Sequence, residues 1–284
     1  MRTPDTYGLL IDVPTSRSTT VSIRVGVIGA RGKTGRYVCA GVVRASDLEL
    51  AAAIARSGVS DHVPAVSGGD PIAIRVSDRL EALTDAHVDV AVDFTSPDAA
   101  VDNVHWCLDR GIHCVVGTSG ITPETVAELG ERSRRTAGRA NLIVAPNFSI
   151  ALVLLERFAI MAAPHFPYVE IVEQHMETKR DAPSGTAVKM ARAIAAARAD
   201  RGAVASSEVV PAARGADVDG VRIHAIRMPS LDGHHAVMLG REGETLTLVH
   251  DSYDPSPFVA GVLMAIRAVA SRPGLTYGFE KLLD

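Results

Sequence analysis

Hydrophobic and polar residues follow two different rhythms along the 284-residue chain. Between residues 23 and 145, short apolar runs such as IRVGVIGA (23–30) and VDVAVDFT (88–95) are each followed by a longer segment with helical spacing. Strands that are apolar throughout and alternate with helices are typical of βαβ units, because helices cover both faces of a parallel sheet. We therefore predict an α/β fold with a Rossmann-like parallel sheet in this half.

The second rhythm begins near residue 148. A predicted helix (149–165) leads into the alternating strand YVEIVEQH (168–175), and later apolar stretches follow one another without helices between them. These later stretches are VRIHAIRM (221–228), HAVMLG (235–240) and ETLTLVHDSY (244–253). The pattern predicts a second domain of α+β type with a mixed or antiparallel sheet, followed by a final amphipathic helix (255–274).

Composition narrows the class of protein. Hydrophobic residues make up 47% of the chain and charged residues 22%, which fits a globular protein with a packed core. A net charge of −4 and an aromatic content of 4% give no case for a nucleic-acid partner. Residues 1–22 are broken by Asp12 and Pro14 before a signal-peptide core develops, and no apolar run reaches the roughly 20 residues that span a bilayer. We expect a flexible N-terminal tail on a cytoplasmic protein without a membrane partner.

Three cysteines, Cys39, Cys107 and Cys114, lie in apolar segments without C-x-x-C spacing. This pattern predicts small core residues in a reducing compartment, and we expect no metal site from it.

The stretch VGVIGARGKTGR places Gly29, Gly32 and Gly35 between the first predicted strand and the first predicted helix. Glycines there allow a tight turn and the close approach of a pyrophosphate, whose charge meets backbone N–H groups at the helix N-terminus. A glycine motif alone also fits a purely structural turn. The strand before it, the helix after it and the βαβ rhythm beyond it favour a nucleotide site.

The end of the second predicted strand indicates which cofactor binds. An acidic residue there would bind the ribose 2′-hydroxyl of NADH, but the strand ends in Ala55 and Arg56, and Glu49 comes too early. Arg56, with Arg31 and Lys33 nearby in sequence, favours the 2′-phosphate of NADPH, and NADH is the alternative cofactor. A second interpretation is that all three cations are solvated surface residues.

A second candidate site lies in EQHMETKRDAPSGTA (173–187). Ser184, Gly185 and Thr186 open a predicted helix, so free N–H groups and two hydroxyls converge at its positive end and form a candidate anion site. The alternative is an ordinary N-cap by Ser184. Lys179 on the same loop favours the anion site, because a cation beside a helix N-terminus is repelled unless an anion lies between them. A substrate with a carboxylate satisfies both.

His175 ends the strand beside this anion site. Histidine can give up a proton near neutral pH, as a general acid must, so we interpret His175 as catalytic, although a lone histidine is more often structural. Arg227, His234 and His235 flank a later loop. They are candidates to close over a substrate, with surface exposure as the alternative.

These stretches together resemble the 4-hydroxy-tetrahydrodipicolinate reductase (dihydrodipicolinate reductase) family, which are pyridine-nucleotide enzymes of bacterial diaminopimelate and lysine synthesis. The resemblance runs from about residue 23 to the C-terminus, and the strings DAPSGTA and APNFS are its most specific parts. It also rests on VGVIGARGKTG, VDFTSPDAA, HCVVGTSG, GARGADVDGVRIHAIR and GETLTLVHDS.

The resemblance implies a dinucleotide-binding domain from residues 23–147 plus 251–284. It also implies a substrate-binding and oligomerisation domain, residues 148–250, which builds a homotetramer. The implied pyrophosphate residues are Gly29, Arg31, Gly32, Lys33 and Gly35. The residues implied on the nicotinamide side are Phe94, Thr95, Gly117, Thr118 and Ser119. The residues implied at the hinge are Ala145, Asn147 and Phe148.

In the second domain, His175 corresponds to the family's proton donor. It would act with Lys179 after hydride transfer to an unsaturated cyclic imine dicarboxylate. The residues that correspond to carboxylate ligands are Lys179, Ser184, Gly185 and Thr186.

The substrate loop departs from the family pattern E-x-H-H-x-x-K-x-D-A-P-S-G-T-A. Met176 replaces the second histidine, which is normally a substrate contact, and Thr178 replaces another histidine common there. A thioether cannot donate to a carboxylate, so the loss of a charge-assisted donor is expected to cost about 1.5–3 kcal/mol of binding. His234 and His235 are candidates to replace it.

Three hypotheses follow. The first is an NADPH-dependent reductase of 4-hydroxy-tetrahydrodipicolinate in lysine biosynthesis. The second, which Met176 favours, is a related reductase acting on a different cyclic imine or enamine acid. The third is a non-catalytic NAD(P)-binding relative, against which the retention of His175 and Lys179 argues.

Overall fold

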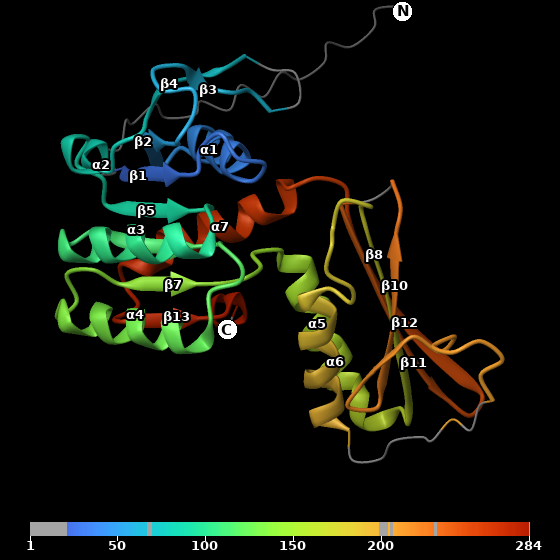
Figure 1. Cartoon of the computed structure of the whole chain (residues 1–284). Coiled ribbons are helices and arrows are strands. Elements are labelled where there is room, and N and C mark those ends of the chain that lie inside the picture. The colour runs from blue at the N-terminus through green and yellow to red at the C-terminus, as the bar shows by residue number, and fades with distance from the viewer. Residues whose placement is uncertain (1–21, 67–69, 199–203, 205–206, 230–231, 284) are drawn as a thin grey trace, which may run out of the picture.

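The computed structural model describes residues 22–66, 70–198, 204, 207–229 and 232–283. In these residues the strands form two sheets, and each sheet carries its own helices (Figure 1). Residues 1–21 of the predicted N-terminal tail lie outside the described part of the chain.

The first sheet has eight strands among the described residues, and its central strands run parallel. In spatial order they are β13 (Leu275–Tyr277), β7 (Leu142–Val144), β6 (His113–Val116), β5 (Val90–Asp93), β1 (Ile23–Ile28), β2 (Leu48–Ile54), β4 (Ile72–Ser77) and β3 (His62–Val63). The chain leaves β1 toward β2 on one side and returns to β5 on the other. The carboxyl ends of β1 and β5 therefore form a topological switch point, where open α/β sheets bind ligands.

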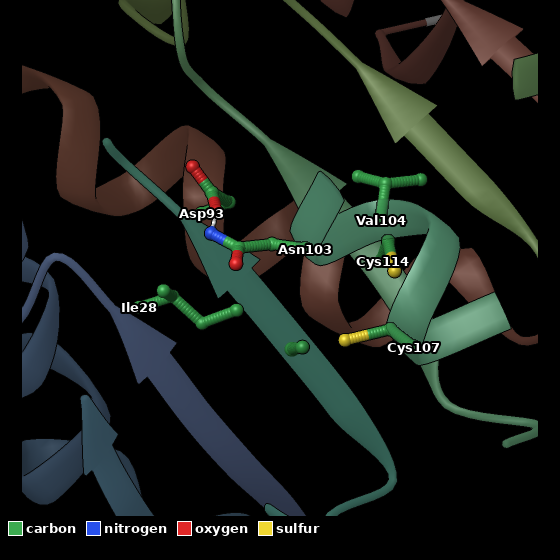
Figure 2. Close-up of a pocket in the computed structure, with 7 residues that line it drawn as sticks. Ile28, Asp93, Asn103, Val104, Cys107 and Cys114 are labelled. Atoms are coloured by element: carbon green, nitrogen blue, oxygen red, sulfur yellow. Dashed lines mark hydrogen bonds between the residues drawn. The ribbon is translucent and has the colours of Figure 1, made fainter. Parts of the chain in front are cut away.

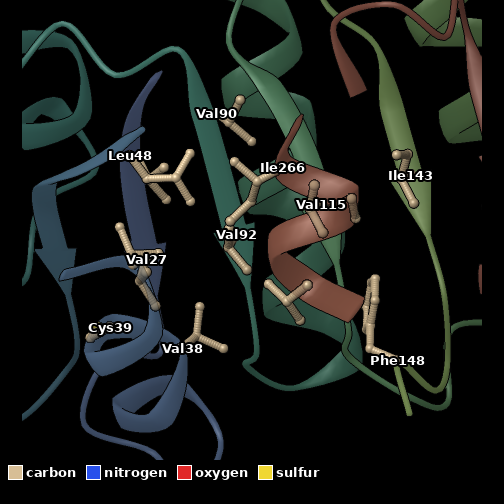
Figure 3. Close-up of a cluster of buried hydrophobic side chains, with 14 of the residues drawn as sticks. Val27, Val38, Cys39, Leu48, Val90, Val92, Val115, Ile143, Phe148 and Ile266 are labelled. Atoms are coloured by element: carbon tan, nitrogen blue, oxygen red, sulfur yellow. The ribbon is translucent and has the colours of Figure 1, made fainter. Parts of the chain in front are cut away.

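Helices cover both faces of this sheet. The helices α1 (Gly35–Arg44) and α7 (Ser256–Val269) pack on one face. On the other face lie α2 (Glu81–Asp85), α3 (Pro97–Asp109) and α4 (Pro123–Arg135). Figure 3 shows the first of these cores, in which Ile266 of α7 meets Val92 and Val115 of the sheet. Because both faces are covered, the central strands are buried throughout, as the apolar runs predicted.

The second sheet is mixed. Its spatial order is β12 (Glu244–Ser252), β11 (Gly233–Arg241), β8 (Tyr168–His175), β10 (Val221–Arg227) and β9 (Ala216–Val218). Of the pairings in this sheet, β8 with β10 is parallel and the others are antiparallel. The helices α5 (Ile150–Ala162) and α6 (Gly185–Ala197) pack on one face through a shared apolar core (Figure 1).

The chain passes between the two sheets twice, once after β7 and once after β12. At the first crossing, Ser149 caps α5, because its Oγ accepts a hydrogen bond from Leu152 N at 3.3 Å. The same Oγ lies 3.2 Å from His250 Nε2 in β12. The carbonyl group of Phe148 lies directly against Gly261 of α7, where a Cβ would overlap it. The end of the first crossing therefore contacts the elements on both sides of the second crossing.

The predicted α/β class is confirmed, with a mostly parallel first sheet and a mixed second one. The sequence pattern did not indicate β3, β9 or β13, which are edge strands of two or three residues. Cys39, Cys107 and Cys114 are buried and unbridged, and burial raises the pKa of Cys39 to about 12. The helices seen in the described ranges are all too short or too polar to cross a membrane. Two 3-10 turns, Ala163–His165 and Phe279–Leu282, complete the elements.

Candidate active site

The glycine turn between β1 and α1 is closely packed against its neighbours. Gly29 has a φ of +84°, and a Cβ on it would overlap the carbonyl oxygen of Phe94. A Cβ on Gly35 would in turn overlap the carbonyl oxygen of Gly29. Thr34, at the N-cap of α1, makes no side-chain cap. Arg36 N and Tyr37 N already donate to the carbonyls of Gly32 and Thr34, so the N–H group of Gly35 is the one at the start of the helix that we expect to face an anion.

A hollow of about 480 Å³ opens beside this turn. Gly29, Ala55, Arg56 and Thr95 line it, so Arg56 borders the space next to the glycine turn. Asp78, directly after β4, lines it as well. No local sequence pattern points to this carboxylate, because only the folded sheet brings the end of β4 beside the end of β2.

The residues expected on the nicotinamide side meet at the carboxyl ends of β5 and β6. A Cβ on Gly117 would overlap the ring of Phe94, and that ring lies 6.2 Å from the ring of Phe148, centroid to centroid. Ala145 is buried in the same core, whereas Ser119 is exposed. The remaining hinge residue, Asn147, accepts a hydrogen bond from Ser149 N at 2.7 Å.

Asp93, the last residue of β5, holds this group together. It is 2% exposed. Its Oδ1 accepts from Thr95 N at 2.9 Å, from Thr95 Oγ1 at 2.7 Å and from Thr118 Oγ1 at 2.9 Å. Its Oδ2 accepts from Asn103 Nδ2 of α3 at 2.7 Å (Figure 2). A buried carboxylate thus orients two of the threonines that the sequence analysis expected at the cofactor.

A second buried carboxylate lies at the end of β8. Glu173 is 0% exposed, and its Oε2 lies 2.5 Å from His175 Nδ1. Arg227, the last residue of β10, donates to both carboxylate oxygens at 3.0 and 2.8 Å. Ser184 N donates to Oε1 at 3.0 Å. Burial alone would raise the pKa of Glu173, but the hydrogen bonds from His175, Arg227 and the Ser184 amide outweigh it and lower the pKa to about 2.

The loop after β8 carries the other predicted substrate residues. Lys179 Nζ lies 2.8 and 2.9 Å from the two carboxylate oxygens of Asp181, and this hydrogen bond lowers the pKa of Asp181. Ser184 Oγ accepts from Ala187 N at 3.2 Å, so Ser184 does cap its own helix. A Cβ on Gly185 would meet no atom within 4 Å, which leaves room for a ligand at this end of α6.

Thr186 and Met176 are both half-buried. Arg227 donates to the backbone carbonyls of Lys179 at 3.2 Å and Asp181 at 2.7 Å. Its guanidinium therefore holds the loop in this conformation, and its proposed contact with substrate stays a prediction.

His235 lies behind His175. His235 is 3% exposed, and its ring meets that of His175 at 5.4 Å and 83°. Neither ring nitrogen of His235 has a hydrogen-bond partner among the described residues. Burial lowers the pKa of His235 to about 3, and positive charge on His175 and His250 acts in the same direction. The alternative of surface exposure is therefore wrong for His235. His234 points to the opposite face and lies 2.6 Å from Asp251 Oδ1.

An ion pair joins the two regions. Lys33 of the glycine turn contacts the carboxylate of Asp232, the residue before Gly233. A Cβ on Gly233 would lie 3.6 Å from His175 Nε2. The glycine turn and the free side of His175 therefore face the same short segment. Arg31 lies apart from this pair, with its Nη1 3.3 Å from Asp61 Oδ2.

Glu173 and Asp93 are the buried carboxylates that the sequence analysis missed. For Glu173 a signal was present. Val169, Ile171, Glu173 and His175 lie on the inward-facing side of β8, so Glu173 occupies a position where the alternation calls for an apolar residue. A carboxylate there requires buried partners.

Comparison with known families covers almost the whole described chain. Residues 23–148 match the model for the N-terminus of dihydrodipicolinate reductase, and residues 151–283 match the model for its C-terminus. The 4-hydroxy-tetrahydrodipicolinate reductase of Corynebacterium diphtheriae is 42% identical over 268 residues, covering 93% of this chain and 100% of the relative. That of Mycolicibacterium vanbaalenii is 45% identical over 264 residues, covering 92% and 99%.

A solved structure shares the fold. The dipicolinate-bound dihydrodipicolinate reductase from Paenisporosarcina sp. TG-14 superposes with a TM-score of 0.79 at 36% identity. The match covers 92% of this chain and 99% of that one.

Proposed function

The chain belongs to the dihydrodipicolinate reductase family, and we propose that it reduces 4-hydroxy-tetrahydrodipicolinate with a nicotinamide cofactor in lysine and diaminopimelate biosynthesis. The observation that carries this proposal is the contact between Lys33 and Asp232. It brings a dinucleotide-type glycine turn to the segment that lies beside His175.

The residues present fit a nicotinamide cofactor. The glycine turn leaves no room for a Cβ, and the hollow beside it is lined by Gly29 and Arg56. When bound, the cofactor supplies the hydride. Loss of the 4-hydroxyl group as water leaves an unsaturated cyclic imine, whose reduction takes one hydride and one proton. We assign the proton to His175 Nε2, because Nδ1 is held by Glu173. His175 then regains a proton from solvent.

We assign the substrate carboxylates to Lys179 and to the turn formed by Ser184, Gly185 and Thr186. A carboxylate would replace Asp181 as the partner of Lys179, and the open space at Gly185 admits a second ligand group at the start of α6. The solved relative that carries dipicolinate supports a dicarboxylate as the ligand.

The test is a direct assay of NADPH oxidation with enzymatically generated 4-hydroxy-tetrahydrodipicolinate. We expect turnover by the wild type and a loss of about 10²–10⁴-fold in kcat for His175→Ala, the usual size of a general-acid contribution. The dissociation constant for NADPH should stay the same. No turnover by a wild type that still binds nucleotide would contradict the proposal.

We propose NADPH as the preferred cofactor because Arg56 and Ala55 stand at the end of β2. Arg56→Ala should raise KM for NADPH about tenfold, as expected for a lost charge-assisted contact, and leave KM for NADH unchanged. Asp78 lines the same hollow and would repel a 2′-phosphate that approached it. A tenfold preference of the wild type for NADH would overturn this assignment.

A second candidate is a reductase of a different cyclic imine or enamine acid. Met176 favours it, because a thioether beside His175 offers no hydrogen bond to a carboxylate. The chain retains His175, Lys179 and the turn at residues 184–186, and this argues against a non-catalytic relative.

We also propose the domain division 23–147 plus 251–284 and 148–250, a cytoplasmic location and a homotetramer. Support for assembly comes from the face of the second sheet opposite α5 and α6, where Ile226 is 39%, Met238 36% and Val249 55% exposed. Val249→Asp should reduce the mass measured by light scattering, whereas Val43→Asp, equally exposed on α1, should not. A wild-type monomer at micromolar concentration would contradict the assembly.

A further inference from the structure

Glu173 connects functional groups that come from separate segments of the chain. Its carboxylate accepts hydrogen bonds from His175 of β8, from the Ser184 amide at the start of α6 and from Arg227 of β10. Arg227 extends the connection to the loop, because it also donates to the carbonyls of Lys179 and Asp181. The acid, the helix start and the lysine loop therefore share one buried anion.

The charge of this anion matters because the groups that contact it are cationic or neutral. On β10, the guanidinium of Arg227 lies against Glu173, and on the loop Lys179 is paired with Asp181. On β11, the ring that packs on His175 is the neutral His235, with His250 of β12 behind it. The pair of His234 and Asp251 lies on the opposite face of the sheet. Among the described residues packed around His175, Glu173 is the carboxylate in contact with its ring.

Hydrogen-bond geometry sets the tautomer as well. With Glu173 on Nδ1, a neutral His175 keeps its proton on Nδ1 and leaves Nε2 as the atom that exchanges protons. A glycine at position 233 keeps the space beside Nε2 open. The same carboxylate thus selects the nitrogen that exchanges protons.

We propose that Glu173 is the positioning residue of this reductase, holding His175 as a proton donor through Nε2 and fixing the substrate loop through Arg227 and Ser184. This inference rests on the proposed function only for the identity of the reaction. Glu173 itself touches neither substrate nor cofactor.

The chain offers a matched control on the same strand. Glu170 lies on the opposite face of β8 and also pairs with an arginine and a histidine, Arg214 and His224, the latter at 2.8 Å. The experiment compares Glu173→Gln with Glu170→Gln. Each protein is assayed for the pH profile of kcat/KM, for NADPH affinity and, by ¹⁵N NMR of the free protein at high pH, for the tautomer of His175.

In Glu173→Gln the negative charge beside His175 is gone. As the pH rises, kcat/KM should therefore begin to fall at a lower pH than in the wild type. We expect the basic limb of kcat/KM to move down by about one pH unit or more, with at least a tenfold loss at pH 8. Activity should recover as the pH falls, because Gln can still accept from Nδ1. The Nδ1–H tautomer should lose its dominance, and NADPH affinity should not change. Glu170→Gln should behave as wild type in all three measurements.

An unchanged basic limb and tautomer in Glu173→Gln, or the same changes in Glu170→Gln, would overturn the proposal. Should Glu173→Gln not fold because Arg227 is left unpaired, Glu173→Gln with Arg227→Gln replaces the ion pair by a neutral one and is held to the same outcomes. The NMR measurement needs no substrate. A wild type that shows the expected tautomer but no turnover would therefore contradict the proposed function and leave the role of Glu173 intact.

Discussion

The glycine turn and the end of β8 face each other, yet they are built in different ways. Around the turn, Gly29, Gly32 and Gly35 lie within one short stretch, and the binding groups that we propose are backbone N–H groups. At the end of β8, the geometry depends on charged side chains from two strands, β8 and β10, and on a backbone carbonyl of the loop. The first region should therefore be sensitive to added volume, and the second to charge and protonation.

The largest effect we expect concerns protonation at the second region. His235 has a folded-state pKa of about 3, below the unfolded value of 6.5, so its contribution to stability is complete above pH 6.5 and is lost as the pH falls toward 3. At about 1.4 kcal/mol per pH unit, the free energy of unfolding of the wild type should fall by about 3 kcal/mol more between pH 7 and pH 4 than that of His235→Phe. Urea titrations at both pH values measure this difference.

His234→Phe is the control for that experiment, because His234 pairs with Asp251 on the other face of β11. Equal pH slopes for wild type and His235→Phe would show that the buried ring is not neutral in the folded state.

A side chain added to the glycine turn should destabilise the fold and weaken cofactor binding. Gly29→Ala combines a positive φ with overlap onto the Phe94 carbonyl, and we expect a loss of about 2 kcal/mol in the free energy of unfolding with at least a tenfold weaker NADPH affinity. Gly243→Ala is the matched control, because Gly243 has a φ of +82° and no atom within 4 Å of a Cβ. It should show the backbone strain alone and bind NADPH normally. Equal effects of the two changes on NADPH binding would remove the glycine turn from the cofactor site.

The smallest effect that we expect concerns Met176 of the loop after β8. Met176→His restores a donor next to His175 and should lower KM for 4-hydroxy-tetrahydrodipicolinate about tenfold. Met161→His, at a position that is 69% exposed on α5, should leave KM unchanged. If Met176→His left KM the same, Met176 would not contact the substrate.

The same contrast explains what the sequence could predict. The glycine turn was readable because its residues are neighbours in sequence and its partners are the flanking strand and helix. Likewise, His175 and Lys179 stood out on a single polar loop. Glu173 did not, because its partner Arg227 arrives only through the parallel pairing of β8 with β10.

His235 was placed near the loop but not in the core. Its burial follows from the register that sets it opposite Glu173 on one side and His250 on the other, and no local pattern encodes that register. No local pattern predicts that Asp78 lines the hollow beside the glycine turn either, since β4 pairs with β2 only in the folded sheet.

The bond between Ser149 and His250 has a mechanical consequence. It joins the start of α5 to β12, and the carbonyl group of Phe148 lies against Gly261 of α7 at the end of the same crossing. The first crossing is thus held to the elements on both sides of the second crossing, so we expect any relative motion of the two sheets to turn about this point. Such a turn would displace Phe148, whose ring lies 6.2 Å from that of Phe94, less than the outer strands of the second sheet.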